Sequence, residues 1–351
     1  MTAAAKRNPS GDSGGSQVLI AILVVVVIGI VCYLLRTILK PFFVAIFLSV
    51  LFEPVMTGLR RLKIPKGIAV IVVLIFAFTL LTLLGLLVYA GASSFADQYP
   101  KYETKVVALF HNILNLFHIP LEDLSNYVNE LDWAKAIQDL SLPSFVSSSV
   151  GSFITFLGNV FLVLLFMVYA LLGREYFFQR IHRAFDEKSS DRIAIAIDNI
   201  NTQVQRYLVT KTAISLLTGT FATCILLLFN VDLAIMFGLL TFLLNYIPNV
   251  GSIIATLPPV LLALLQFDSS LRPLWIGIFL IAGQMSMGNI LEPRLMGKSL
   301  DLSPLVVILF LIFWGFLWGI VGMVLAVPFA ATIKIVTSNI DSMRPISILM
   351  S

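Results

Sequence analysis

A carboxylate and a guanidinium flank a proline near the end of an apolar run: Glu292 and Arg294 stand on either side of Pro293. A charge at the centre of a membrane-spanning helix costs roughly 2.5–3.5 kcal/mol on the insertion scale, so such groups mark candidate proton or ion sites. Glu292 could bind a proton or a monovalent cation, with Arg294 tuning that binding. Alternatively, the two form an interfacial pair that only anchors the helix end. Other polar candidates in or beside apolar stretches are Glu53, Asp232, Asn245, Gln284 and Asn289.

Two apolar stretches, 231–266 and 303–333, are each interrupted near the middle. The first interruption reads Asn245-Tyr-Ile-Pro248-Asn249-Val-Gly251, and the second contains Trp314-Gly315 and Gly319-Ile-Val-Gly322. The amino-acid sequences that end the two interruptions are similar, because in each a Val-Gly pair is followed by an alanine and then a proline. Each flank is about fifteen residues long, which is short for a hydrocarbon core of ~30 Å at a rise of about 1.5 Å per residue.

The interruptions are candidate binding elements. A break exposes backbone N–H and C=O groups, which survive in lipid only where protein, water or a ligand meets them. Glycines at such places allow tight turns and close approach of backbones, although packing alone would also explain them. The candidate substrate- or ion-binding residues at the two tips are Asn245, Pro248, Asn249, Gly251, Gly315, Gly319 and Gly322.

The bulk composition is that of a membrane protein. Of 351 residues, 59% are hydrophobic and 12% charged, which is about half the charged fraction of a globular chain. The runs Val18–Leu35 and Gly67–Ala96 carry no charge and are long enough to span a bilayer. The net charge of +4 comes from basic residues beside apolar segments, where they set topology and do not indicate a nucleic-acid partner.

Cysteine usage and motifs exclude several other classes. Cys32 and Cys224 lie inside apolar runs and have neither disulfide nor metal-ligand spacing. The chain has no Walker motif, HExxH, Gly-x-Ser-x-Gly or Cys-pair signature. We therefore expect no enzyme activity, no cofactor, no metal and no ATP-driven step.

Charge in the loops predicts the topology. The predicted spans lie near 17–35, 41–57, 67–92, 150–172, 211–229 and 273–291. Lys and Arg concentrate in 53–66 and 173–211, whereas 93–149 is rich in acids, so the first two are predicted to be cytoplasmic and the third outside. Both termini are then cytoplasmic. By the same reasoning 231–266 starts and finishes outside, and 303–333 starts and finishes inside.

These patterns predict an all-α polytopic membrane protein with about six full spans, two re-entrant helical hairpins in an inverted repeat, and amphipathic surface helices. Alternatively, 231–246 and 250–266 are two complete short spans. Inverted repeats with broken helices are typical of alternating-access transporters. The predicted segments are a disordered cytoplasmic tail (1–16), N-terminal spans (17–92), an extracytoplasmic amphipathic segment (93–149), a span (150–172), a cytoplasmic amphipathic segment (173–210), a transport core (211–340) and a cytoplasmic tail (341–351).

The interrupted stretches also carry a family resemblance. Over residues 17–340 the chain resembles the autoinducer-2 exporter (AI-2E) family of bacterial membrane proteins. The matching stretches are Asn245–Gly251 with Pro258, Leu291-Glu-Pro-Arg-Leu-Met-Gly297, Leu302-Ser-Pro304, Trp314-Gly315, and Gly319–Gly322 with Pro328. The resemblance implies a permease of the bacterial plasma (inner) membrane. Some members export a small signalling molecule, and others resemble sodium or lithium/proton antiporters.

We therefore expect a transporter that works without ATP. Its substrate would be either a small signalling metabolite, which it exports, or a monovalent cation, which it exchanges for protons. Membrane lipid is an expected partner, and the chain could form a homo-oligomer. The alternative is a membrane scaffold that recruits partners through the amphipathic segments 93–149 or 174–210.

Overall fold

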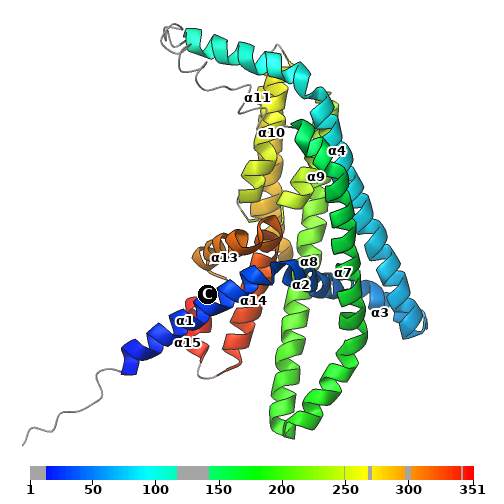
Figure 1. The fold of residues 1–351 in the computed structure, drawn as a ribbon, viewed down its shortest axis with the longest axis vertical. Helices are drawn as coiled ribbons and strands as arrows, with labels where there is room; N and C mark the ends of the chain where they lie inside the picture. Colours follow the sequence, from blue (N-terminus) through cyan, green and yellow to red (C-terminus); the bar gives the residue numbers. More distant parts are fainter. Residues whose placement is uncertain (1–12, 117–141, 249, 268–270, 297–301, 341–342) are drawn as a thin grey trace, which may run out of the picture.

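The computed structural model describes residues 13–116, 142–248, 250–267, 271–296, 302–340 and 343–351 (Figure 1). All regular secondary structure in these ranges is helical, so the predicted all-α membrane fold is confirmed. The helices are α1 (Ser13–Leu34), α2 (Arg36–Leu51), α3 (Glu53–Arg61), α4 (Lys66–Leu116), α7 (Leu142–Ala184), α8 (Glu187–Leu228), α9 (Ala234–Leu244), α10 (Val250–Gln266), α11 (Leu271–Met285), η1 (Ser286–Leu291), α12 (Glu292–Met296), α13 (Pro304–Trp318), α14 (Ile320–Ser338) and α15 (Arg344–Leu349). Most of the predicted tail 1–16, part of the segment 93–149, and Asn249 lie outside the described residues.

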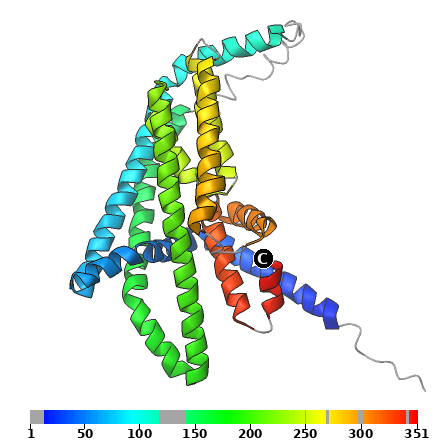
Figure 2. The same ribbon diagram turned by 180° about the vertical axis from the view of Figure 1, so that it is seen from behind.

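Five helical segments of the described chain are long and apolar enough to cross a membrane. They are Lys66–Phe95, Ile154–Gly173, Ser189–Leu228, Leu271–Leu295 and Ile320–Ser338. The first four overlap the predicted spans that begin at residues 67, 150, 211 and 273. Helix α7 continues beyond Gly173 to Ala184, and the 40-residue segment Ser189–Leu228 of α8 is about twice the length that a bilayer needs. The two helices therefore form long arms, joined at Phe185–Asp186, that project from one end of the molecule (Figures 1 and 2).

The N-terminal region differs from the prediction of two separate spans at 17–35 and 41–57. Helices α1 and α2 meet at a bend of 93°, so together they amount to one broken span or a re-entrant pair. The physical reason is charge and length. Two cations, Arg36 and Lys40, stand at the start of α2. Its 16 residues rise only about 24 Å against a hydrocarbon core of ~30 Å.

The first interrupted stretch forms a helical hairpin. After α8 the chain reverses at a corner in which Asn230 and Leu233 have positive φ, 56° and 60°. Helix α9, with 11 residues, rises only about 17 Å before the break at Asn245. Helix α10 then returns toward the end where α9 began and continues into α11, which packs along it (Figures 1 and 2).

The second interrupted stretch forms another helical hairpin, from α13 and α14, which pack against each other. In contrast to the short flank that was predicted, its second arm, Ile320–Ser338, is long and apolar enough to cross a membrane. Gly319 joins them with φ 68° and ψ −145°, a conformation that glycine adopts far more readily than other residues. At the base, the N–H of Ser303 donates to the carbonyl of Met350 at 2.9 Å, so the start of α13 lies beside α15, the helix that follows α14. This hairpin occupies the lower half of Figure 1 and the first hairpin the upper half, as an inverted repeat requires.

The two tips are built in the same way. A Cβ atom on Gly251 would overlap the carbonyl oxygen of Leu244, and one on Gly322 would overlap that of Trp314. Each glycine therefore lets the start of the second arm lie against the last turn of the first arm. This shared contact is the structural counterpart of the repeated Val-Gly in the sequence.

Apolar side chains join the two hairpins to each other. Leu244, Ile247 and Ala255 of the first hairpin form one buried cluster with Leu311 and Ala326 of the second. Burial of such side chains inside a bilayer gains packing contacts rather than removal from water. The tips are thus packed on protein, which is where backbone breaks are tolerated at membrane depth.

Polar contacts hold the corner between α8 and α9. Asp232 accepts hydrogen bonds from the phenol of Tyr102 and, at 3.0 Å, from the ammonium of Lys101, both on the extension of α4. The side chain of Gln266 accepts from the N–H of Asp232 at 2.8 Å and donates to the carbonyl of Asn230 at 2.7 Å. The base of the first hairpin is therefore fixed to the extension of α4.

We predict that Gly251→Ala and Gly322→Ala each destabilise the protein by at least 1–3 kcal/mol, roughly the cost of overpacking, because the added methyl group meets a backbone carbonyl that cannot rotate away. Thermal unfolding in detergent would measure the loss. Gly158→Ala is the matched control, since a Cβ atom there meets nothing within 4 Å. A melting temperature in the tip variants equal to that of the control would contradict this packing.

A second prediction concerns pH. Burial raises the pKa of Asp232, but the hydrogen bonds from Tyr102 and Lys101 outweigh burial and hold that pKa below 3.8. A lowered carboxyl pKa contributes stability above the unfolded pKa and loses it as pH falls through the folded pKa. At pH values below about 4, the unfolding temperature of the wild-type protein should therefore decrease more steeply with falling pH than that of Asp232→Asn. Parallel profiles for the two proteins would exclude the contact as a source of stability.

Candidate functional site

An ion pair joins two membrane-spanning segments. The Nζ of Lys211 on α8 donates to both carboxylate oxygens of Glu292 on α12, at 2.7 and 2.8 Å. The Lys211 side chain is 4% exposed and that of Glu292 23%. A charge buried this far needs a partner, because removing one member of a buried pair costs roughly 3–5 kcal/mol. Glu292 is thus held by Lys211, and Arg294, its expected partner, is exposed.

Lys211 belongs to a polar stripe on α8. Tyr207, Lys211 and Ser215 follow one another at intervals of four residues, which places them on one helix face. All three are buried, with exposed fractions of 4%, 3% and 0%. Tyr207 also lies within electrostatic range of Glu292 and Tyr246. Helix α8 therefore presents a phenol, an ammonium and a hydroxyl to the interior of the protein.

The tip of the first hairpin docks on this stripe. The phenol of Tyr246 donates to the hydroxyl of Thr212 at 2.8 Å, and the amide of Asn245 donates to the hydroxyl of Ser215 at 3.0 Å. Thr212 directly follows Lys211 in the sequence, and Ser215 lies four residues after it. The predicted tip residue Asn245 therefore lies on the same helix face as the ion pair, within one helical turn of Lys211 along α8.

Glu292 follows a change in helix type. Residues Ser286–Leu291 form a π-helix between α11 and α12. Pro293 has no N–H to donate to the carbonyl of Asn289, so the α-helical pattern is already weakened here. Single turns of π-helix inside α-helices occur frequently at functional sites, because the extra residue re-aims the side chains that follow. Here the carboxylate that follows the π-helix meets Lys211.

Gln284 lies at a separate place. It lines a cavity of about 10 Å³ with Thr218, Thr241 and Thr256. Each threonine hydroxyl donates to the backbone carbonyl four residues earlier. The oxygen lone pairs of each hydroxyl then remain available as acceptors facing the cavity. The space is about the size of one water molecule, lies about one turn further along α8, and is lined mostly by apolar side chains beside these polar groups.

The other predicted residues have varied positions. Asn289 in the π-helix and Arg294 in α12 are exposed, and no contact recorded for the described residues joins them to the ion pair. Pro248 is half-buried at the first tip, and Gly315 packs beside Met323. Gly251, Gly319 and Gly322 shape the hairpins. The structure thus brings together two of the predicted residues, Asn245 and Glu292.

The α8 residues of this site and Tyr246 were not predicted from the sequence as site residues. Lys211 was counted among the basic residues that set topology, because it stands where the charged segment 173–211 meets the apolar run 211–229. The signal that could have identified it is the spacing of four between Tyr207, Lys211 and Ser215, which puts three polar groups on one face of a membrane helix.

The chemistry available at this site is proton exchange and monovalent-ion binding. A carboxylate and an ammonium lie beside two phenols, two hydroxyls and an amide, all of which donate or accept hydrogen bonds. Among the described residues there is no group of three or more His, Cys, Asp or Glu side chains that could hold a metal ion. The cysteines of this part of the chain, Cys32 and Cys224, are free thiols.

Known proteins resemble this chain over nearly its whole length. Residues 20–342 match the family described as AI-2E family transporter. The AI-2 transport protein TqsA of Escherichia coli K12 is 30% identical over 347 residues, which cover 95% of this chain and 94% of that protein. A provisionally named transport protein of Borreliella burgdorferi is 31% identical over 316 residues, covering 90% and 85%. Another, YhhT of Escherichia coli K12, is 28% identical and covers 94% and 92%.

The family match spans both hairpins, the polar stripe of α8 and the ion pair, and the aligned region covers most of the length of each relative. These matches confirm the resemblance found in the sequence and favour transport over the scaffold alternative. The chain belongs to the AI-2E family of membrane transporters.

Proposed function

We propose that this protein moves a small solute by alternating access, and that the Lys211–Glu292 ion pair couples the movement to a proton or a monovalent cation. The observation that carries the proposal is that a buried lysine of the first structural repeat holds the one carboxylate that follows the π-helix of the second repeat. Two repeats linked by a breakable charge pair form a two-state element of the kind that transport requires.

The coupling follows from the electrostatics of the pair. Lys211 on α8 precedes the first hairpin, and Glu292 on α12 precedes the second. Movement of one repeat against the other separates the two charges. This separation costs free energy, because the Lys211 side chain is only 4% exposed and would be left buried without a counter-charge. Binding of a proton or a monovalent cation to Glu292 removes that attraction and lets the repeats move.

The proposed solute path runs along the tip of the first hairpin and the stripe of α8. Asn245 and Tyr246 at the tip and Thr212 and Ser215 on the stripe exchange hydrogen bonds with each other. The same groups could bind a small polar solute once the tip moves. The name of one relative, AI-2 transport protein, supports a small signalling metabolite as the solute. The acid–base pair supports proton-coupled exchange of a monovalent cation.

Flux measurements with purified protein in liposomes test the proposal. We predict that Glu292→Gln abolishes proton- or cation-coupled flux, read with a pH-sensitive dye in gradients of sodium, lithium or potassium. The variant should also lose on the order of 3 kcal/mol of stability, because its buried lysine is left without a counter-charge. Reduced flux in this variant alone would therefore not separate transport from folding.

The double variant Lys211→Gln/Glu292→Gln makes that separation. It removes both charges and keeps neutral groups that can form a hydrogen bond, so its unfolding temperature should recover toward that of wild type. Coupled flux should remain absent. Arg294→Gln is the matched control, since Arg294 is an exposed neighbour on α12 and should keep wild-type flux. Wild-type pH dependence of transport in a stable double variant would remove the ion pair from the mechanism.

The same liposomes distinguish the two solutes. Uptake or release of a radiolabelled small signalling metabolite without any ion requirement would support export. Proton release that depends on an added monovalent cation, with no metabolite present, would support antiport.

A further inference from the structure

A buried tyrosine lies one helical turn from the ion pair. Tyr207 precedes Lys211 by four residues on α8, and its side chain is 4% exposed. Among the described residues, no hydrogen bond is recorded for its hydroxyl group. Polar groups buried to this degree are nearly always hydrogen-bonded, so an unbonded hydroxyl here calls for a physical reason.

Tyr207 lies where α8, the second hairpin and Glu292 meet. Helix α14 packs against α8, and the tyrosine belongs to the same buried cluster as Trp318 of α13 and Leu325 of α14. Its phenol is also within electrostatic range of Glu292 and Tyr246. The side chain therefore connects the packing of the second hairpin with the carboxylate of the ion pair.

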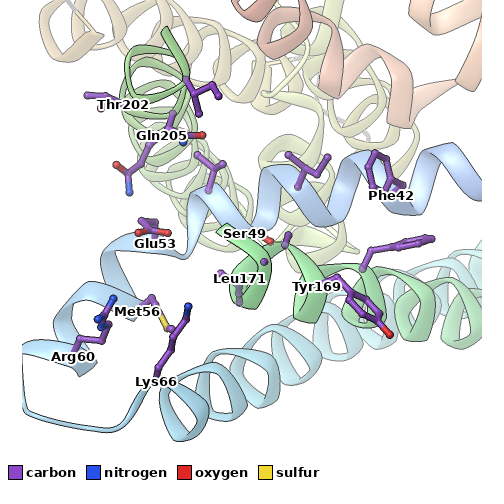
Figure 3. A pocket seen from close by; sticks show the side chains of 17 residues that line it. Phe42, Ser49, Glu53, Met56, Arg60, Lys66, Tyr169, Leu171, Thr202 and Gln205 are labelled. Carbon is purple, nitrogen blue, oxygen red and sulfur yellow. The ribbon is translucent and has the colours of Figure 1, made fainter. Parts of the chain in front are cut away.

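The opposite face of α8 has a different environment. A cavity of about 740 Å³ lies between α2, α3, α4, α7 and α8 (Figure 3). Thr202 and Gln205 border it from α8, whereas Tyr207 and Lys211 do not line it. Residues two apart on a helix point roughly 200° from each other, so Gln205 and Tyr207 lie on opposite faces of α8. The partners open to the tyrosine hydroxyl are therefore those on the side of the ion pair.

The proposed coupling creates a need for a hydrogen-bond acceptor at this place. Both carboxylate oxygens of Glu292 accept from the Nζ of Lys211 in the present structure, at 2.7 and 2.8 Å. When Glu292 binds a proton, its carboxyl group gains an O–H donor. An ammonium group has three donors and no acceptor, so Lys211 cannot accept from that O–H. The neutral carboxyl group needs an acceptor on another residue.

Of the two phenols beside Glu292, Tyr207 is the one that is not already bonded. The hydroxyl of Tyr246 donates to that of Thr212 at 2.8 Å, which ties it to α8. The hydroxyl of Thr212 in turn donates to the carbonyl of Leu208 at 2.7 Å. A phenol both donates and accepts, so the Tyr207 oxygen can receive the new O–H without breaking an existing contact.

We propose that the hydroxyl of Tyr207 is the second partner of Glu292 and accepts a hydrogen bond from the protonated carboxyl group once the contact with Lys211 opens. The inference rests on the proposed function, because it requires Glu292 to take up a proton during transport. The proton stays on Glu292, and Tyr207 keeps its own. Tyr207 is thus a positioning residue: it holds the neutral carboxyl group beside the cluster that contains the second hairpin.

This arrangement determines the direction of a pH effect. In the paired form the hydroxyl makes no bond with the carboxylate, so it stabilises the protonated form of Glu292 alone, and an acid stabilised in this way keeps its proton to higher pH. The π-helix carries no charged or titratable side chain. On the other elements around this point the described ones are Arg206 and Lys211 of α8, Tyr246 of the first tip, Arg294 of α12, Lys334 of α14, Arg36 and Lys40 of α2, and Arg180, His182 and Arg183 near the end of the α7 arm.

Infrared difference spectroscopy of the purified full-length protein tests the proposal directly. The C=O stretch of the protonated Glu292 carboxyl group is followed against pH and assigned by its absence in Glu292→Gln. Tyr207→Phe keeps the ring and removes the hydroxyl alone. In this variant the band should titrate about one pH unit lower than in wild type, since a net hydrogen bond is worth about tenfold in an equilibrium constant.

Transport and stability provide two further readouts of Tyr207→Phe. The pH at which coupled flux in liposomes is half-maximal should fall by the same amount of about one unit, while the rates of variant and wild type converge at low pH. The unfolding temperature should not fall, because the lost hydroxyl bonds nothing in the paired form. Tyr169→Phe is the matched control: Tyr169 is 70% exposed and borders the cavity of Figure 3, so all three readouts should equal those of wild type.

The outcomes separate this inference from the proposed function. A Glu292 band with the same titration midpoint in wild type and Tyr207→Phe would overturn the role of Tyr207 and leave coupling through Glu292 intact. A midpoint shifted to higher pH would also overturn it, since the hydroxyl would then stabilise the carboxylate. A clearly lower unfolding temperature would show that the hydroxyl is bonded in the paired form, with the same consequence. The absence of any titrating Glu292 band would overturn the proposed proton coupling itself.

Discussion

Every backbone N–H and C=O group at membrane depth must find a partner in the protein, and the architecture of this chain follows from that constraint. Two apolar stretches are broken, so their free backbone groups must be covered. The chain covers them by folding each stretch into a hairpin whose tip packs on the other hairpin through Leu244, Ile247, Leu311 and Ala326. Gly251 and Gly322 allow the close approach of the arms that this solution needs.

The same constraint governs charge. Lys211 is buried inside the protein, and its ammonium contacts both carboxylate oxygens of Glu292. Their contact joins α8, which leads into the first hairpin, to α12, which precedes the second. Arg60 and Lys66 have a different setting, since Arg60 is exposed near the end of α3 and Lys66 is the first residue of a membrane span. Buried and interfacial charge therefore have separate roles here.

Much of the fold was predictable from the sequence, because its strongest signals are local. The apolar runs correctly predicted four of the membrane spans. The interruptions near Asn245 and Gly319, each followed by Val-Gly, correctly predicted that both stretches fold into helical hairpins. The bend between α1 and α2 was not predictable in this way, since an apolar run does not specify its direction. The partner of Glu292 was missed for another reason: Lys211 lies 81 residues away in the chain, and only the path of α8 and α12 brings the two together.

The similarity of the two hairpin tips bears on the alternative conformation that the proposed transport cycle requires. Gly251 and Gly322 sit in equivalent contacts, yet residues 245–249 separate α9 from α10 in the sequence, whereas Gly319 alone separates α13 from α14. Two copies of one unit therefore hold two different shapes in the same molecule. In the alternating-access mechanism that we propose, exchange of these shapes between the two copies would produce the conformer that opens to the opposite side of the bilayer. The difference between the two hairpins would then describe the shape that each takes in that other state.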